Sequence, residues 1–141
     1  MNTDALGLAL ARASGGLTWE YPCLIWIADY LRDATGRDPA AAWRAINWNE
    51  ATARHELGRL AVAGEGRTAV ERALDAIAKR DGWQAVDGPR QGSVMIGCYR
   101  SEDGIGIPAI FDGHRRWIVS NDGQGWASHS ATPETMWEVT T

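Results

Sequence analysis

The chain has 141 residues, of which 45% are hydrophobic and 23% are charged. That length and composition are typical of one globular domain with one hydrophobic core, so we expect a single domain over residues 1–141. The formal net charge is −4, and the arginines are scattered between acidic residues. This pattern lacks the basic patch of a nucleic-acid-binding protein.

Neither a membrane span nor a secretion signal is expected. The longest apolar run, residues 24–28, ends at Asp29, far short of the ~20 residues that a span requires. The first residues do not carry the positive charge that opens a signal peptide. We therefore expect a soluble, unexported chain in which Cys23 and Cys98 stay reduced.

Two helices are predicted in the first third of the chain. Thr3 or Asn2 can cap a helix to about residue 13, with an apolar side of alanines and of Leu6, Leu8 and Leu10. Pro22 suits the first turn of a second helix, to about residue 34, with Gly36 as its stop. Steps of three and four predict its buried face: Cys23, Ile27, Tyr30, Leu31 and Ala34. Cys23 therefore sits in its first turn.

Three further helices follow. Asp38 as N-cap and Pro39 at the first helical position predict a short helix to about residue 46. Another is expected over residues 49–61, with an apolar side of Ala53, Leu57 and Leu60. Thr68 can cap a last helix to about residue 79, ended by Gly82, with the inward residues Val70, Leu74, Ile77 and Ala78.

After Gly82 the hydrophobic period changes to that of strands. Alternating residues and Gly-containing turns predict strands over residues 94–99, 105–111, 117–119 and 137–139. Pro108 cannot donate a backbone hydrogen bond, so its nitrogen should face an edge or a bulge. Residues 124–130 are predicted to form a loop. The predicted fold class is α+β, with N-terminal helices packed on a C-terminal antiparallel sheet.

One constellation of residues indicates a family. A Trp precedes a Cys that opens a buried helix, and a Gly-led strand and a hairpin strand come later. The matching residues are Trp19, Pro22-Cys23, Ala28-Asp29, Thr35-Gly36-Arg37-Asp38-Pro39-Ala40-Ala41, Pro89-Arg90-Gln91-Gly92-Ser93-Val94-Met95 and the segment 105–113. In this order of parts the chain resembles the NlpC/P60 group of papain-like cysteine hydrolases. It resembles more closely a set of small proteins from bacterial prophages and phage tail gene clusters.

The resemblance implies a catalytic cysteine, but the sequence departs from the family pattern at its partners. Cys23 would be the nucleophile, favoured as an anion by a helix N-terminus. The family's base opens the strand after the Gly-Asp strand, where this chain has Ile105 or Gly106, and the orienting residue falls near Val119. None of these can transfer a proton. Pro22 and Ser93 also replace two aspartates of the pattern.

No histidine takes over the missing position in an obvious way. His55 falls opposite the apolar stripe of its predicted helix, and His114 follows the Asp112-Gly113 turn at the far end of the hairpin. His129, in the segment that reads as a loop, is the one candidate for a displaced base. The alternative for Cys23 is that it serves as a small buried hydrophobe.

Eight tryptophans against one phenylalanine mark a core, an interface or a sugar-binding surface. Trp19 and Trp126 are candidates to line a ligand groove, and the polar surroundings of Trp48, Trp117 and Trp126 suit anchors for a partner. No Cys-x-x-Cys pair, His-x-x-x-His motif or close acidic cluster predicts a metal site, and no cofactor is expected.

The resemblance and the incomplete site together suggest a non-catalytic component of a bacteriophage or prophage tail, placed near the tail tip. Its partners would be tail hub or tail-tip proteins. Such a chain would reside in the host cytoplasm during assembly and then in the virion tail. Two alternatives stay open: an active cell-wall cysteine hydrolase with Cys23 as nucleophile and His129 as base, and a peptidoglycan-binding module.

Overall fold

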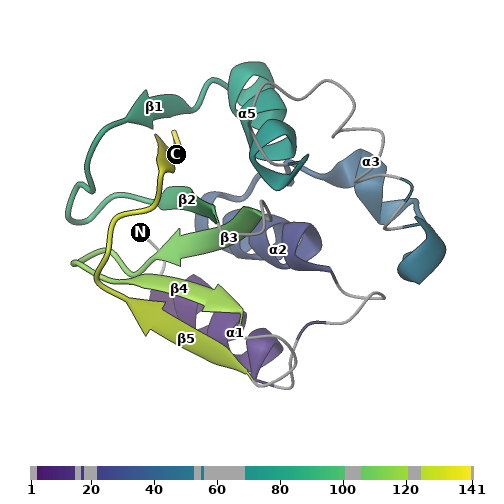
Figure 1. Cartoon of the computed structure of the whole chain (residues 1–141), viewed down its shortest axis with the longest axis horizontal. Helices are drawn as coiled ribbons and strands as arrows, with labels where there is room; N and C mark the ends of the chain where they lie inside the picture. Colours follow the sequence, from purple (N-terminus) through teal and green to yellow (C-terminus); the bar gives the residue numbers. More distant parts are fainter. Residues whose placement is uncertain are drawn as a thin grey trace.

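The computed structural model describes residues 3–14, 17, 22–52, 55, 69–100, 106–120 and 125–140. Helices occupy the first part of the chain: α1 (Thr3–Ala13), α2 (Cys23–Thr35), α3 (Ala41–Arg44) and α5 (Ala69–Asp81). Residues 50–52 and 55 are also helical, and the rest of the helix expected there lies outside the described residues. Figure 1 shows the helices gathered around an antiparallel sheet.

The described residues form a sheet of six strands in the order β1-β6-β2-β3-β4-β5. Their bounds are β1 (Gln84–Val86), β2 (Met95–Arg100), β3 (Gly106–Phe111), β4 (Trp117–Ser120), β5 (Trp126–His129) and β6 (Thr135–Glu138). Every strand pairing is antiparallel. The α+β prediction, with helices preceding an antiparallel sheet, is confirmed.

Two strands differ from the sequence-based expectation. β5 lies in a segment whose pattern predicts a loop, and β1, which no pattern predicts, has only three residues. Both are edge strands, with one ladder partner each, so their side chains are too exposed to alternate cleanly between apolar and polar. Pro108 lies in the inner strand β3 and not at an edge of the sheet; it is paired with Cys98 of β2, and the ladder with β4 begins one residue later, at Ala109.

Helix α2 is the centre of the packing. Residues 24–31 are all buried, including Asp29, so the helix is enclosed on all sides over this stretch and not on one face as predicted. Its Trp26 is fully buried and donates a hydrogen bond from Nε1 to the Ala9 carbonyl of α1 at 2.9 Å. A core residue of α2 therefore also holds its neighbouring helix in place.

On the predicted apolar side of α1, the alanines are buried more deeply than the leucines, of which Leu6 and Leu10 pack on the core and Leu8 does not. Ala5, Ala9 and Ala13 are fully buried, whereas Leu8 is 46% exposed. The three alanines are spaced by four residues and so form one stripe of the helix. Small side chains allow the backbone of α1 to come close enough to accept the bond from Trp26.

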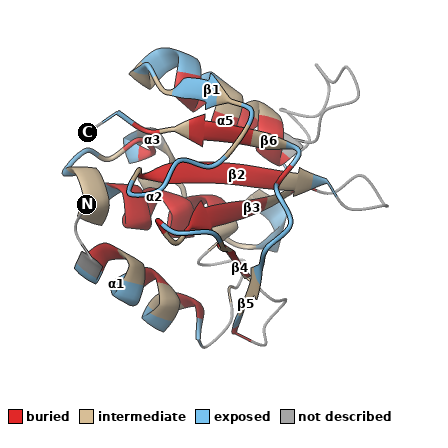
Figure 2. Cartoon of the chain, turned by 90° about the vertical axis from the view of Figure 1, so that its left-hand side faces the viewer, coloured by how far each residue is buried: buried red, intermediate tan, exposed pale blue. Residues whose placement is uncertain are grey.

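The central strands of the sheet are largely buried (Figure 2), and apolar side chains lie on both faces. The helix face packs on α1, α2 and α5 through Ile96, Cys98, Ile110, Ile118 and Trp137. The second face, which we call the loop face, contains Met95, Ala109, Phe111, Trp117, Val119 and Met136. The connection from β5 to β6 covers this face, since Tyr99 donates to the Ala131 carbonyl and Pro133 lies over Gly97.

Helix α5 is attached to the sheet by an ion pair between a buried carboxylate and an exposed arginine. Glu71 is fully buried and accepts two hydrogen bonds from Arg100, at 2.7 Å from Nε and 3.0 Å from Nη2. The helix begins at Ala69, Gly82 follows it with φ 75°, and the four predicted inward residues are buried. The prediction for the described part of this helix is confirmed.

The segment between α2 and α3 differs from its prediction. The cap of α3 is Ala40, not Asp38, and the helix has only four residues. Asp38 accepts the Ala40 N–H at 3.1 Å and also pairs with Arg44. The Asp38 carboxylate therefore stabilises a turn before the helix, and its contact with Arg44 holds it there.

Gly97 provides a test of the packing on the loop face. A Cβ at this position would lie 2.7 Å from Cγ of Pro133 and 3.0 Å from Cζ3 of Trp117. We expect Gly97→Ala to lower the free energy of unfolding by about 1–3 kcal/mol, as overpacked cores do. Chemical denaturation measures the change.

Gly7→Ala is the matched control. Gly7 is exposed in α1, and a Cβ there would meet nothing within 4 Å. Alanine is the better helix former, so this variant should gain ~0.5–1 kcal/mol. Equal stabilities for the two variants would contradict the close packing of Pro133 on Gly97.

Candidate functional site

Cys23 begins α2, as predicted, and its side chain packs against the core on the helix face. Pro22 precedes it in an extended conformation and provides no side-chain cap. The residue keeps part of its surface exposed, yet burial raises the pKa of the thiol to about 11. The backbone N–H groups of Leu24 and Cys23 act in the opposite direction and are outweighed. At neutral pH Cys23 is therefore a thiol and not a thiolate.

His129 lies on the other side of the sheet from Cys23. It is opposite Trp117 in the β4–β5 ladder, and residues that oppose each other in a ladder share a face. Trp117 belongs to the loop face. The His129 ring also contacts Tyr99 edge-on, with centroids 5.8 Å apart, and Tyr99 packs on the loop face. The structure does not bring Cys23 and His129 together.

The two remaining histidines are exposed. His55 is helical, and His114 lies in the turn after Asp112, whose Oδ1 accepts its N–H at 2.8 Å. Where the family would place its base, β3 opens with Gly106, which has no side chain. Ile105 lies outside the described residues. Of the candidate bases, His129 thus lies across the sheet from the thiol, and Gly106 has no side chain that could accept a proton.

The tryptophans divide between core and surface. Trp26, Trp117 and Trp137 are buried, which corrects the interpretation of Trp117 as an anchor for a partner. Trp117 alternates onto the loop face, where its ring lies 5.0 Å from that of Phe111. Trp126 is 41% exposed, and Trp19 lies outside the described residues. Of the two groove candidates, the structure therefore places only Trp126, at the start of β5.

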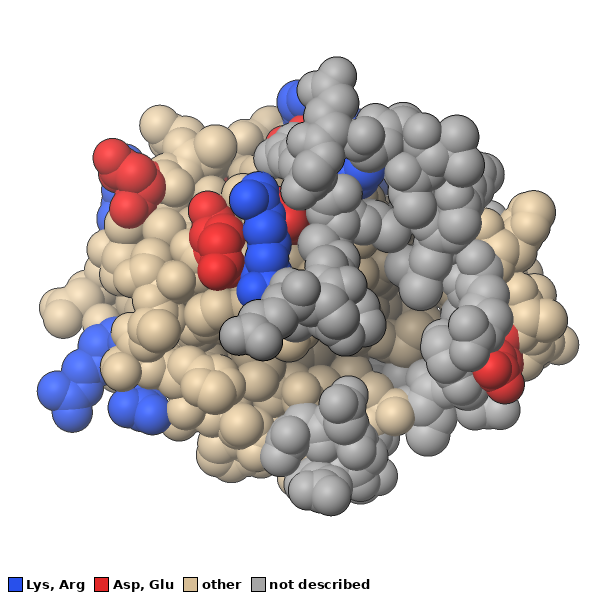
Figure 3. Space-filling model, in the orientation of Figure 1, with Lys and Arg blue, Asp and Glu red and all other residues tan. Residues whose placement is uncertain are grey.

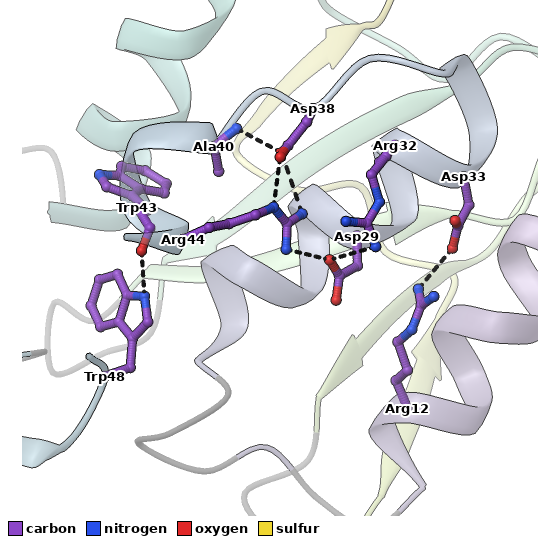
Figure 4. Close-up of polar contacts among 9 residues, drawn as sticks. All are labelled: Arg12, Asp29, Arg32, Asp33, Asp38, Ala40, Trp43, Arg44 and Trp48. Atoms are coloured by element: carbon purple, nitrogen blue, oxygen red, sulfur yellow. Dashed lines mark hydrogen bonds and ion pairs between the residues drawn. The ribbon is translucent and has the colours of Figure 1, made fainter. Parts of the chain in front are cut away.

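A network of charged side chains joins α2 to α3 (Figure 4). Arg44 lies between Asp38 and Asp29, at 2.6 Å from Nε to Oδ2 of Asp38 and 2.7 Å from Nη1 to Oδ1 of Asp29. Arg32 reaches the same Asp29 oxygen at 3.4 Å. Hydrogen bonding from Arg44 lowers the pKa of Asp38. Sequence reasoning missed this network, although Asp29 interrupts an apolar run and so signals a buried charge.

A shallow hollow lies beside this network. It has a volume of about 330 Å³ and is lined by Ile25, Arg44, Ile46, Asn47 and Trp48. The Trp48 ring is held by a 2.8 Å hydrogen bond from its Nε1 to the Trp43 carbonyl. The next helix begins with a reciprocal cap, in which Asn49 and Thr52 each accept the other's backbone N–H. Local hydrogen bonds thus hold the wall of the hollow in place.

The described residues contain neither an arranged set of metal ligands nor a disulfide. No group of three His, Cys, Asp or Glu side chains among them is arranged to hold a metal ion. Red and blue side chains lie intermixed on the face drawn in Figure 3, without a broad basic area in its described part. Within the described ranges, no helix is both long and apolar enough to cross a membrane. Cys23 and Cys98, both described, are not joined by a disulfide.

Comparison of the chain with protein-family models, with curated proteins and with solved structures finds no match.

The Asp38–Arg44 contact makes stability depend on pH. Because the folded-state pKa of Asp38 is lowered from its ordinary 3.8, its stabilising contribution is complete above that value and is lost as the pH falls through the folded pKa. We expect Asp38→Asn to be less stable at neutral pH and to lose less further stability between about pH 5 and pH 3. Urea denaturation at a series of pH values measures both effects.

Arg44→Gln is the companion variant, because it removes the main cause of the shift and should flatten the same pH dependence. If Asp38→Asn kept the wild-type slope, the contact would not hold in solution.

Proposed function

We propose that this chain is a non-catalytic interaction protein, a structural component of a bacteriophage or prophage tail near its tip, built on a degenerate papain-like fold. The observation that carries the non-catalytic part is the state of Cys23. Its thiol is held neutral by burial, and the candidate base His129 lies on the opposite face of the sheet. A cysteine hydrolase needs a thiolate and a base within hydrogen-bond reach.

The arrangement of parts supports the papain-like assignment. A central buried helix opens with a cysteine and packs on an antiparallel sheet, and the following Gly-led strand and hairpin occur in the order that the resemblance implies. The tail context rests on the resemblance alone.

Exposed aromatic surface supports a binding role. Trp126 is exposed at the edge of the sheet, and the hollow beside Trp48 combines an oriented indole with an arginine. Tryptophan and arginine are enriched among the residues that contribute most to protein interfaces. Both features lie on secondary structure or on capped turns, so little conformational freedom would be lost on binding.

The reactivity of Cys23 tests the loss of catalysis. We expect alkylation of the wild-type protein, followed at each cysteine by peptide mass analysis, to show a midpoint for Cys23 close to pH 11, because burial disfavours the thiolate. Fully buried Cys98 is the internal comparison and should remain unmodified while the fold is intact. A Cys23 midpoint below the ordinary ~8.5 would mean an activated nucleophile and would contradict the proposal.

The tail assignment needs a separate experiment. We expect mass spectrometry to detect the chain in purified virions of the phage or prophage that encodes it, and the tagged protein to recover tail hub or tail-tip proteins from a lysate of producing cells. The Cys23→Ser variant should enter virions as well as wild type does, because the thiol has no role in binding. Absence of the chain from virions would refute the tail role.

A further inference from the structure

The backbone of β5 has a defined inner and outer side. The backbone N–H of Asp112 donates to the Arg116 carbonyl at 2.9 Å, in continuation of the β3–β4 register that pairs Ile110 with Ile118. Hydrogen-bonded pairs alternate along an antiparallel ladder. Ile118 therefore directs its N–H and C=O to β3, and its neighbours Trp117 and Val119 direct theirs to β5.

Two residues of β5 consequently direct their backbone N–H and C=O groups away from the sheet. His129 and Ala127 oppose Trp117 and Val119, so their N–H and C=O groups are used in the ladder with β4. Trp126 and Ser128 direct theirs outward. β5 is the last strand of the sheet, and Figure 1 shows no described element beyond it.

Arg116 covers part of this edge. Its Nε donates to Oγ of Ser128 at 2.9 Å and its Nη2 donates to the Ser128 carbonyl at 3.0 Å. The guanidinium thus occupies an outward-facing acceptor on which an added strand would depend. Charged side chains at sheet edges are a common protection against pairing with another chain.

The strand itself has no such protection. Its four residues, Trp126-Ala127-Ser128-His129, include no lysine, arginine, acidic residue or proline. Trp126 exposes 41% of its surface. Pairing two copies of this strand would bring none of its own residues into like-charge contact. The two Arg116 side chains, which lie outside the strand, would have to move away from the edge first.

We propose that the outer edge of β5 is a strand-pairing surface for a second copy of this chain, and that Arg116 holds it closed. Around a two-fold axis through Ala127, Trp126 of each copy exchanges backbone hydrogen bonds with Ser128 of the other. This register keeps opposed side chains on one face, as an antiparallel ladder requires. The Ser128 carbonyl accepts either from Arg116 or from the second copy's Trp126, so the two contacts compete. The inference is independent of Cys23 and of the tail role.

Removal of the guanidinium tests the proposal. In sedimentation velocity over a concentration series, we expect the wild-type protein to stay monomeric and Arg116→Ala to shift toward dimer as its concentration rises. Arg115→Ala is the matched control, since it removes the same charge from the neighbouring exposed residue and should stay monomeric. The glutamine of Arg116→Gln is too short to make both contacts, so this variant should dimerise as well. It replaces the alanine variant in the test if circular dichroism shows that Arg116→Ala is poorly folded.

A second substitution tells edge pairing from other association. Ser128→Pro in the Arg116→Ala background deletes an outward N–H that is not used in the β4–β5 ladder, and proline is tolerated at such edge positions. The double variant should return to a monomer. Folded Arg116 variants that stay monomeric at every concentration would overturn the proposal. So would a dimer that persists in the folded double variant, or a wild type that dimerises as strongly as Arg116→Ala.

Discussion

The structure depends on the enclosure of α2. Eight consecutive residues of this helix are buried, which requires neighbours on every side: α1, the sheet, and the segment that leads into α3. Trp26 shows how closely these neighbours are placed, because its indole fills the core and also donates to the backbone of α1. Asp29 is buried in the same stretch and is tolerated because Arg44 and Arg32 supply opposite charge.

The same enclosure determines what Cys23 can do. A helix N-terminus stabilises a thiolate, and in this position the backbone N–H groups do lower the pKa, but burial against the core has the larger effect. In a catalytic thiol the groups that lower the pKa must outweigh burial, and a nearby imidazole usually provides this effect. The strand that would carry the imidazole opens with glycine, and the ring of His129 rests on Tyr99 across the sheet. Among the described residues, the burial of Cys23 and the placement of His129 thus both disfavour an activated thiol.

Arginines make the connections between elements. Arg100 holds Glu71 of α5, Arg44 joins α2 to the turn before α3, and Arg116 fastens the edge strand β5. The planar guanidinium can bind a carboxylate or a carbonyl through two nitrogens at once, which fixes orientation as well as distance. These arginines, scattered along the sequence, therefore have specific structural partners.

The sequence by itself determined the elements whose side chains repeat with a clear period. The described parts of α1, α2 and α5, the strands β2, β3 and β4, the start of α2 at Cys23 and the glycine at the head of β3 all follow from local spacing and residue type. Tertiary structure alone decided the remainder. β1 and β5 form at the edges of a sheet whose other strands create their partners, and Trp117 is buried because the β5–β6 connection covers a second face. Asp38 turns toward Arg44 and not onto a helix end, and His129 falls on the face away from Cys23. Each of these depends on a contact between residues distant in the sequence, or on the parity of a strand within the assembled ladder, and local periodicity carries neither kind of information.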